Sequence, residues 1–253
     1  MATFALELKQ VNMTFGRDTL LRDVNLSVKE GESVVLIGPS GEGKSVLLKL
    51  FAGIMPPSSG QVFIDGKDIH AVDDEERTKL MLKMGMLFQK NALFDSLTVG
   101  DNIAFPLREI SALAETEIQT RVDQFLTAVG LIEAKTRYPN EISGGMQKRL
   151  GIARALALEP DIVLYDDPTA GLDPITSRKI IDLILKLKKE NESTVVAVTN
   201  DMARAFQLAD RLVMVVDHEV IVTGNMHQTL EHKDPRIRQF VRGLLEGPLT
   251  AEA

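Results

Sequence analysis

The sequence contains no cysteine among its 253 residues. This absence excludes disulfide bonds, thiolate nucleophiles and zinc sites built on thiolates. Basic residues are outnumbered, because 29 Lys and Arg stand against 36 Asp and Glu, which leaves a net charge of −7. A general nucleic-acid-binding protein needs a basic face, so this balance argues against that class.

Long apolar runs are also missing. The longest, such as Val34–Ile37, have the length of a strand and fall far below the roughly 20 residues that a membrane-spanning helix requires. The segment Met1–Phe15 has neither the basic start nor the long apolar core of a signal peptide. If the protein works at a membrane, we therefore expect another chain to cross it.

The chain is long enough for one large α/β domain or two small lobes. Apolar residues alternate with polar ones across residues 6–11 and 21–28, which predicts half-exposed antiparallel strands. Continuous apolar runs at 34–37, 162–165 and 194–199 instead predict strands that are buried on both faces.

Helical periodicity separates these runs. Apolar residues recur at helical spacing across 118–129 and again across 180–185. Strands that alternate with helices imply a mostly parallel sheet with helices on its faces. We interpret the stretch from about 90 to 158 as an inserted helical subdomain, in which Pro106 and Pro139 are expected to interrupt the helical segments.

The end of the chain carries a further helical pattern. Apolar residues at helical spacing predict an amphipathic helix over about 235–246, which stops near Gly247 and Pro248. Packing against its own domain is favoured over binding to a partner. We therefore expect a single domain over 1–248, followed by a short tail over 249–253.

A phosphate-binding motif spans Gly38–Ser45 and fits G-x-x-x-x-G-K-[ST], between a predicted strand and a predicted helix. Glycines let backbone N–H groups converge on phosphate oxygens, and the following helix directs its positive end at them. Lys44 is expected to neutralise the β- and γ-phosphates, and the Ser45 hydroxyl to bind Mg²⁺. The residues predicted to contact ATP in this segment are Gly38, Pro39, Ser40, Gly41, Glu42, Gly43, Lys44, Ser45 and Val46.

A second part of a nucleotide site lies further along the chain. The apolar strand that starts at Asp161 ends in the carboxylate of Asp166, which is expected to hold Mg²⁺ through its water shell. Many strands end in Asp, so this feature gains weight only when it is paired with the phosphate motif.

A third motif narrows the choice among families of phosphate-binding proteins. In the segment Asn140–Leu150, Ser143, Gly144 and Gly145 open a predicted helix, and such a start forms a second anion site. This segment resembles the signature sequence of ABC ATPases, and the resemblance covers nearly the whole chain. It implies a P-loop NTPase of ABC type: a mostly parallel core sheet, an antiparallel β subdomain and an inserted helical subdomain. It also implies that the signature, with Met146, closes on ATP held by a second ATPase subunit.

The resemblance implies functional roles for three further residues. Phe15 would stack on adenine, with a buried strand residue as the alternative. Gln89 would sense Mg²⁺ and face the permease. Asp173, in the segment Ala170–Asp173, would lie in the loop that crosses the dimer interface.

Two positions depart from the pattern of that family. Asp167 stands where ABC ATPases typically have the glutamate that orients the attacking water, and Asn200 stands where they have a histidine. A carboxylate that is set back by about 1 Å can lower a rate on the order of 10²-fold, and an uncharged amide cannot supply the stabilisation of an imidazolium. We expect slow hydrolysis by Asp167 and Asn200 with Lys44 and Gln89. The alternative is a weakly hydrolysing, ATP-gated subunit of an asymmetric pair.

Within the ABC group, the sequence resembles the ATPases of Mla-type (maintenance of lipid asymmetry) phospholipid transporters. The resemblance rests on residues 91–94 and 101–109, on Met146 and on the tail from Gln239 to Pro248. It implies ATP and Mg²⁺ as cofactors, and as partners a second copy, an integral membrane permease, a membrane-anchored lipid-binding subunit and a small regulatory subunit. It places the chain at the cytoplasmic face of a bacterial inner membrane. An ATPase of another importer or of a lipoprotein-release system remains the alternative.

Overall fold

The computed structural model describes residues 3–250. The chain divides into two compact units. The first unit takes in the chain up to Met81 and again from Thr194 onward, and the second spans Leu82–Ser193. The second unit is thus inserted between the two segments of the first.

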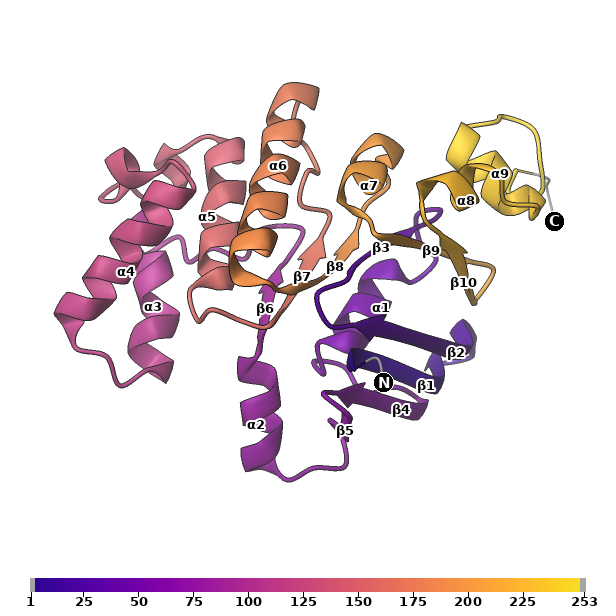
Figure 1. Cartoon of the computed structure of the whole chain (residues 1–253), viewed down its shortest axis with the longest axis horizontal. Helices are drawn as coiled ribbons and strands as arrows, with labels where there is room; N and C mark the ends of the chain where they lie inside the picture. The colour runs from indigo at the N-terminus through magenta and orange to yellow at the C-terminus, as the bar shows by residue number, and fades with distance from the viewer. Residues whose placement is uncertain (1–2, 251–253) are drawn as a thin grey trace. The chain divides into compact units, whose positions relative to one another are not determined.

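The first unit contains an antiparallel sheet in the order β2-β1-β4-β5 (Figure 1). Leu6 lies opposite Val28, and Leu8 lies opposite Leu26, so the apolar residues of β1 and β2 share the buried face. The half-exposed antiparallel strands predicted over 6–11 and 21–28 are therefore confirmed. The strands are β1 (Phe4–Phe15), β2 (Asp18–Lys29), β4 (Ser59–Ile64) and β5 (Lys67–Asp68).

The same unit holds a mixed sheet in which β3 (Ser33–Ile37) runs parallel to both β8 (Thr194–Val198) and β9 (Arg211–Val216). Every residue of β3 and β8 is buried, as the continuous apolar runs predict. β10 (Glu219–Gly224) pairs antiparallel with β9. The helices of this unit are α1 (Lys44–Phe51), α2 (Asp74–Leu82), α7 (Met202–Leu208), α8 (Met226–Leu230) and α9 (Pro235–Arg242). Parallel strands with helices beside an antiparallel sheet confirm the predicted α/β class.

The second unit combines two parallel strands with a group of helices. β6 (Met84–Leu87) pairs with β7 (Ile162–Asp166), and β7 is buried along its length. The helices are α3 (Val99–Ile110), α4 (Glu115–Ala128), α5 (Gly144–Leu156) and α6 (Pro174–Asn191), with short 3-10 turns at Ile132–Ala134 and Pro139–Glu141. Helices α4 and α6 carry the two predicted helical patterns.

Helices α3 and α4 lie side by side and share an apolar core with α5 (Figure 1). Ile103, Val122 and Leu150 are fully buried in it, one from each helix. The expectation that Pro106 interrupts this stretch is wrong, because Pro106 lies inside α3. Ala104 and Leu107, on either side of it, are buried in the apolar core of this unit, and this burial offsets the backbone hydrogen bond that a proline removes.

The final helix, α9, begins at Pro235 and ends at Arg242. It stops before the expected residue 246 because Gly243 adopts a left-handed conformation with φ 62°, the usual helix C-terminal signal. Ile237 is fully buried, and α9 packs against α8 of its own unit. Residues 251–253 of the expected tail lie outside the described residues.

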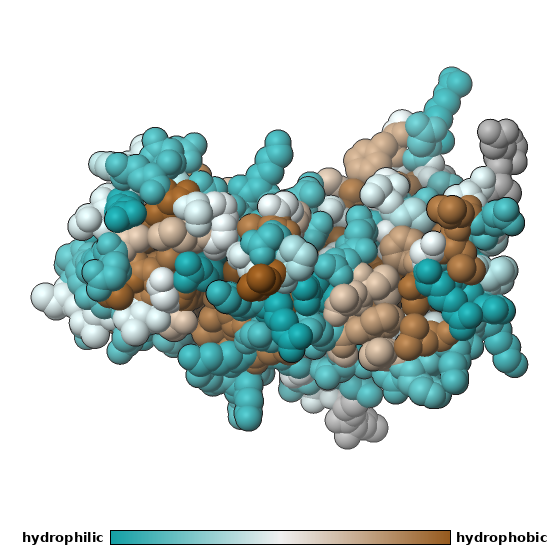
Figure 2. Space-filling view, turned by 90° about the horizontal axis from the view of Figure 1, so that it is seen from above, coloured by the Kyte–Doolittle hydropathy of each residue, from teal (hydrophilic) through white to brown (hydrophobic). Residues whose placement is uncertain are grey.

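Within residues 3–250, no helix is both long and apolar enough to cross a bilayer. On the face that Figure 2 shows, apolar side chains are interspersed with polar ones.

Candidate functional site

The phosphate loop connects the end of β3 to the start of α1 in the first unit. Gly38, Gly41 and Gly43 have φ angles of 136°, 91° and 95°, which L side chains rarely adopt. Lys44 opens α1 and is 6% exposed, and its Nζ donates to the carbonyls of Gly38 at 2.7 Å and Pro39 at 2.6 Å. The ammonium is therefore held inside the loop at the N-terminus of a helix, where a phosphate binds best.

Two of these glycines are also required by packing. A Cβ on Gly38 would lie 2.2 Å from the backbone oxygen of Val215 in β9. A Cβ on Gly43 would lie 2.9 Å from Cγ of Leu20 in β2. The loop therefore lies directly against two strands, and larger residues at these positions would displace it.

Asn200 lies beside the phosphate loop. It follows β8, and its Nδ2 donates to Oγ of Ser40 at 3.5 Å. The next residue, Asp201, caps α7 by accepting from the backbone N–H of Ala203 at 2.9 Å. The cap fixes the backbone next to Asn200, and the amide of Asn200 lies beside Ser40 of the phosphate loop.

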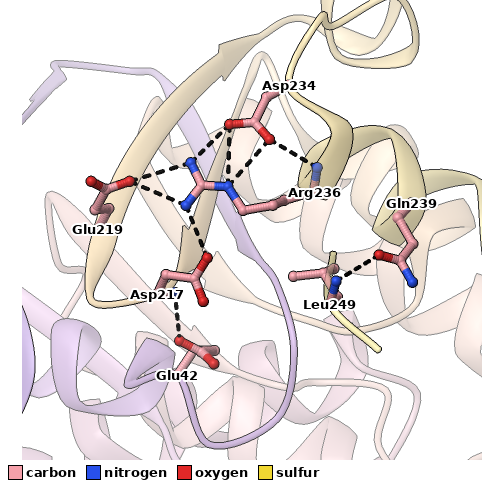
Figure 3. A network of polar contacts seen from close by, with 7 residues as sticks. All are labelled: Glu42, Asp217, Glu219, Asp234, Arg236, Gln239 and Leu249. Carbon is pink, nitrogen blue, oxygen red and sulfur yellow. Dashed lines mark hydrogen bonds and ion pairs between the residues drawn. The ribbon is translucent and has the colours of Figure 1, made fainter. Parts of the chain in front are cut away.

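Glu42 anchors the middle of the loop to the β9–β10 turn. Its carboxylate accepts from the backbone N–H of Asp217 at 2.9 Å. The side chain of Asp217 in turn accepts from Nη1 of Arg236 in α9 at 2.9 Å (Figure 3). Arg236 also contacts Asp234 and Glu219, so one guanidinium joins three carboxylates around the base of this turn.

Phe15 is the last residue of β1, where it pairs with Asp18 of β2. Its side chain is 49% exposed, in contrast to the buried strand residue considered as the alternative. An exposed ring at a strand end is available for stacking on a base.

In the second unit, β7 ends at the predicted acidic pair. Asp166 is the last residue of β7 and only 6% exposed. Asp167 follows with a left-handed backbone, φ 46°. Aspartate tolerates this conformation better than most residues because its short side chain can form local hydrogen bonds. The turn after β7 thus suits the aspartate that replaces the expected glutamate.

Gln89 follows β6, the parallel neighbour of β7, and its side chain is exposed. Its backbone carbonyl accepts from Nζ of Lys148 in α5 at 2.7 Å. The same ammonium reaches the carbonyl of Asp167 at 3.4 Å. The segments that carry Gln89 and Asp167, two of the four predicted catalytic residues, are therefore joined through one lysine.

The signature residues open α5 as predicted. Ser143 caps the helix by accepting from the backbone N–H of Met146 at 3.3 Å. Asp173 caps α6 by accepting from the N–H groups of Ile175 and Thr176, and the hydrogen bond to Thr176 lowers the pKa of its carboxyl. The two helix starts line one cavity of about 490 Å³ in this unit. Its lining residues are Ser143, Gly144, Gly145, Met146, Arg149, Gly171, Leu172, Asp173, Thr176, Lys179 and Ile180.

The family follows from comparison with known proteins. Residues 21–170 match the sequence profile of the family described as ABC transporter. The chain belongs to the ABC transporter family. It is an ABC-type ATPase that binds and hydrolyses ATP, and members of this family form dimers and pair with membrane permeases.

Two relatives and one solved structure illustrate the similarity. The chain is 38% identical over 244 residues to the intermembrane phospholipid transport system ATP-binding protein MlaF of Haemophilus influenzae, covering 96% of this chain and 92% of the relative. It is 38% identical over 261 residues to the chloroplastic protein TRIGALACTOSYLDIACYLGLYCEROL 3 of Arabidopsis thaliana, covering 96% and 75%. The dimeric ATP-binding cassette MJ0796 bound to ADP and Pi has a TM-score of 0.78 and 38% identity, covering 85% of this chain and 96% of that one.

Sequence reasoning missed the residues that support this site. Lys148 lies inside the signature segment, but no role was predicted for it, because a lysine in a helix is usually exposed to solvent. Asp217 and Arg236 were missed because Asp217 contacts Glu42, 175 residues away, and Arg236 contacts Asp217, 19 residues away. The contact of Arg236 with Asp234, two residues before it, is a local signal.

Proposed function

We propose that this ABC ATPase powers phospholipid transport at the inner membrane of a bacterium, as the ATPase of an Mla-type system. The observation that carries the proposal is the 38% identity to the MlaF of Haemophilus influenzae, which extends over 96% of this chain and 92% of that protein. Similarity that spans both chains includes the segments outside the common nucleotide-binding motifs. The cargo itself is not read by the ATPase, so the lipid assignment needs its own test.

In the proposed hydrolysis, Lys44 neutralises charge on the β- and γ-phosphates, and Asp167 orients the attacking water. Asn200 donates a hydrogen bond to the γ-phosphate from its place beside Ser40. Positioning and charge neutralisation supply most of the catalysis of phosphoryl transfer. Because Asp167 is shorter than glutamate and Asn200 is uncharged, we expect slow turnover.

Magnesium fits the residues that are present. The proposed ligands Ser45, Gln89 and Asp166 offer a hydroxyl, an amide oxygen and a carboxylate, which are the oxygen donors that Mg²⁺ prefers. Within residues 3–250, no group of three or more His, Cys, Asp or Glu side chains could hold a metal by itself. Mg²⁺ usually keeps several of its waters and binds substrate phosphates, so a few oxygen ligands from the protein suffice. When bound, the ion neutralises developing charge on the phosphates.

The active form proposed here is a homodimer. The cavity at the start of α5 is lined by the N-terminal end of this 13-residue helix and by the basic residues Arg149 and Lys179. A helix N-terminus and basic side chains both attract an anion. We assign this cavity to the phosphates of a nucleotide that a second copy of the chain holds. Two such sites would then form at each dimer interface.

A permease is expected to dock on an apolar groove of about 230 Å³ in the second unit, beside Phe94 and Phe105. Their side chains are 42% and 39% exposed, and their ring centroids are 4.8 Å apart. Exposed neighbouring aromatics are typical of sites that a partner protein covers. Phe105→Ser should therefore abolish co-purification of the permease, whereas Ile132→Ser, at a residue that is 37% exposed elsewhere in this unit, should preserve it.

The decisive experiment is to purify the tagged chain from its host membranes in detergent, and to identify the co-purifying proteins and lipids by mass spectrometry. We expect a permease, a lipid-binding membrane-anchored subunit, a small regulatory subunit and bound phospholipid. After reconstitution into liposomes, ATP should drive movement of a fluorescent phospholipid, and Lys44→Ala should abolish it. An intact complex that hydrolyses ATP but contains and moves no phospholipid would refute the lipid assignment.

A further inference from the structure

A buried lysine joins three segments of the second unit. Lys148 in α5 is 4% exposed, and its Nζ donates to the backbone carbonyls of Gln89 at 2.7 Å and Asp167 at 3.4 Å. Burial lowers the pKa of this ammonium, and the negative charges of Asp167 and Asp166 oppose that effect. A buried ammonium is expensive to desolvate, so this arrangement persists only because carbonyls and nearby carboxylates surround it.

The two carbonyls stand at corresponding places in the sheet. β6 and β7 pair in parallel, with Leu87 opposite Tyr165, so the loop that holds Gln89 and the turn that holds Asp167 leave the same edge. Both residues lie past the last paired positions of the two strands. The carbonyl of Asp167 also accepts from the backbone N–H of Ala170 at 3.2 Å, within its own turn. The ammonium of Lys148 adds a link between that turn and the loop that holds Gln89.

Helix α5 contacts the same loop at two further points. A Cβ on Gly151 would lie 2.5 Å from Leu87 and 3.5 Å from Asn91, so the glycine permits a close approach. Arg154 donates from Nη2 to the carbonyl of Asn91 at 3.2 Å. Lys148, Gly151 and Arg154 follow one another at steps of three, which places them along one side of a helix. The loop is thus held along α5, and Lys148 alone of these three also reaches the turn after β7.

We propose that Lys148 is a positioning residue for ATP hydrolysis, because its ammonium holds the backbone of Gln89 and the backbone of Asp167 in one fixed arrangement. This inference rests on the proposed roles of Asp167 and Gln89 and extends them to a residue that contacts the backbone of both. Fixing the carbonyl of Asp167 fixes the base of its carboxylate, and a misplacement of about 1 Å costs on the order of 10²-fold in rate.

The test compares steady-state ATP turnover of Lys148→Met, Lys148→Arg and the wild type, with Lys186→Met as control. Lys186 is 58% exposed on α6 and lies outside the site. We expect Lys148→Met to lower kcat roughly 10- to 100-fold with KM for ATP changed less than about twofold, because uniform binding through the phosphate loop is intact. Lys148→Arg should recover at least about tenfold of the loss, since a guanidinium still donates to both carbonyls.

A second measurement separates positioning from a merely structural role. In an Asp167→Asn background, Lys148→Met should change kcat less than about twofold, because residues that act as a unit are not additive. Equal losses in both backgrounds, or a kcat of Lys148→Met within twofold of the wild type, would overturn the inference. If Asp167→Asn alone leaves kcat unchanged, the proposed role of Asp167 is what has failed. If Lys148→Met does not fold, Lys148→Gln takes its place under the same criteria.

Discussion

Gly38→Ala isolates the contact between the phosphate loop and β9. The new Cβ would meet the backbone oxygen of Val215 at 2.2 Å, its carbonyl carbon at 3.2 Å and its nitrogen at 3.3 Å. All three atoms belong to the backbone of a strand that pairs on both sides, so no side-chain rotation relieves the overlap. Either the loop or β9 must move.

The expected loss of stability in Gly38→Ala has two contributions. A non-glycine residue in left-handed backbone costs about 1–2 kcal/mol, and Gly38 has φ 136°. Overpacking against a rigid neighbour adds about 1–3 kcal/mol. Gly41 provides the matched control, because its φ is 91° but a Cβ there would meet nothing within 4 Å. Gly41→Ala should therefore carry only the first contribution.

Urea unfolding of the two variants measures the difference directly. We expect Gly38→Ala to lower the free energy of unfolding by about 1–3 kcal/mol more than Gly41→Ala. Binding of a fluorescent ATP analogue should weaken more in Gly38→Ala as well, because relief of the clash displaces the loop. Equal destabilisation by both substitutions would refute the conclusion that β9 backs the phosphate loop.

Three other perturbations test the remaining parts of the site. Ser143→Arg should leave ATP binding intact but abolish ATP-driven dimerisation in light scattering, because a guanidinium fills the anion site at the start of α5; unchanged dimerisation would contradict the shared site. Asp167→Glu combined with Asn200→His should raise turnover roughly 10- to 100-fold by restoring reach and charge, and an unchanged rate would mean that the native pair already suffices. Arg236→Met should lower the free energy of unfolding by about 1 kcal/mol at pH 7. Because the hydrogen bond to Arg236 lowers the pKa of Asp234, this contribution is complete above the ordinary pKa of about 3.9 and is lost as the pH falls through the lowered value. Urea unfolding of wild type and variant should therefore converge near pH 3 or below, and a constant difference would exclude the carboxylate as the partner.

The candidate site was predicted most completely where its residues are contiguous. The phosphate loop, the helix start at Ser143 and the strand that ends at Asp166 each combine a local residue pattern with a local element. In each, the backbone conformation and the chemistry come from the same few residues. The strand and helix patterns were recovered for the same reason, because burial on one face or both leaves a period in the sequence.

Prediction failed where long-range packing decides. Pro106 was expected to interrupt a helix that in fact continues through it, because the neighbours of α3 stabilise it against a local penalty. The end of α9 at Arg242 was missed for a local reason, because the apolar spacing continues past Gly243, where the backbone turns left-handed.

The sequence by itself determined the family, the phosphate loop and the two departures at Asp167 and Asn200, because these depend on which residues are adjacent along the chain. Only the tertiary structure decided what supports them. The ammonium of Lys148 reaches carbonyls that are 59 and 19 residues away, and Glu42 is held by a backbone N–H that is 175 residues away. Such contacts depend on how the strands and helices pack. Two residues that meet only through this packing leave no periodicity or motif in the sequence around either of them.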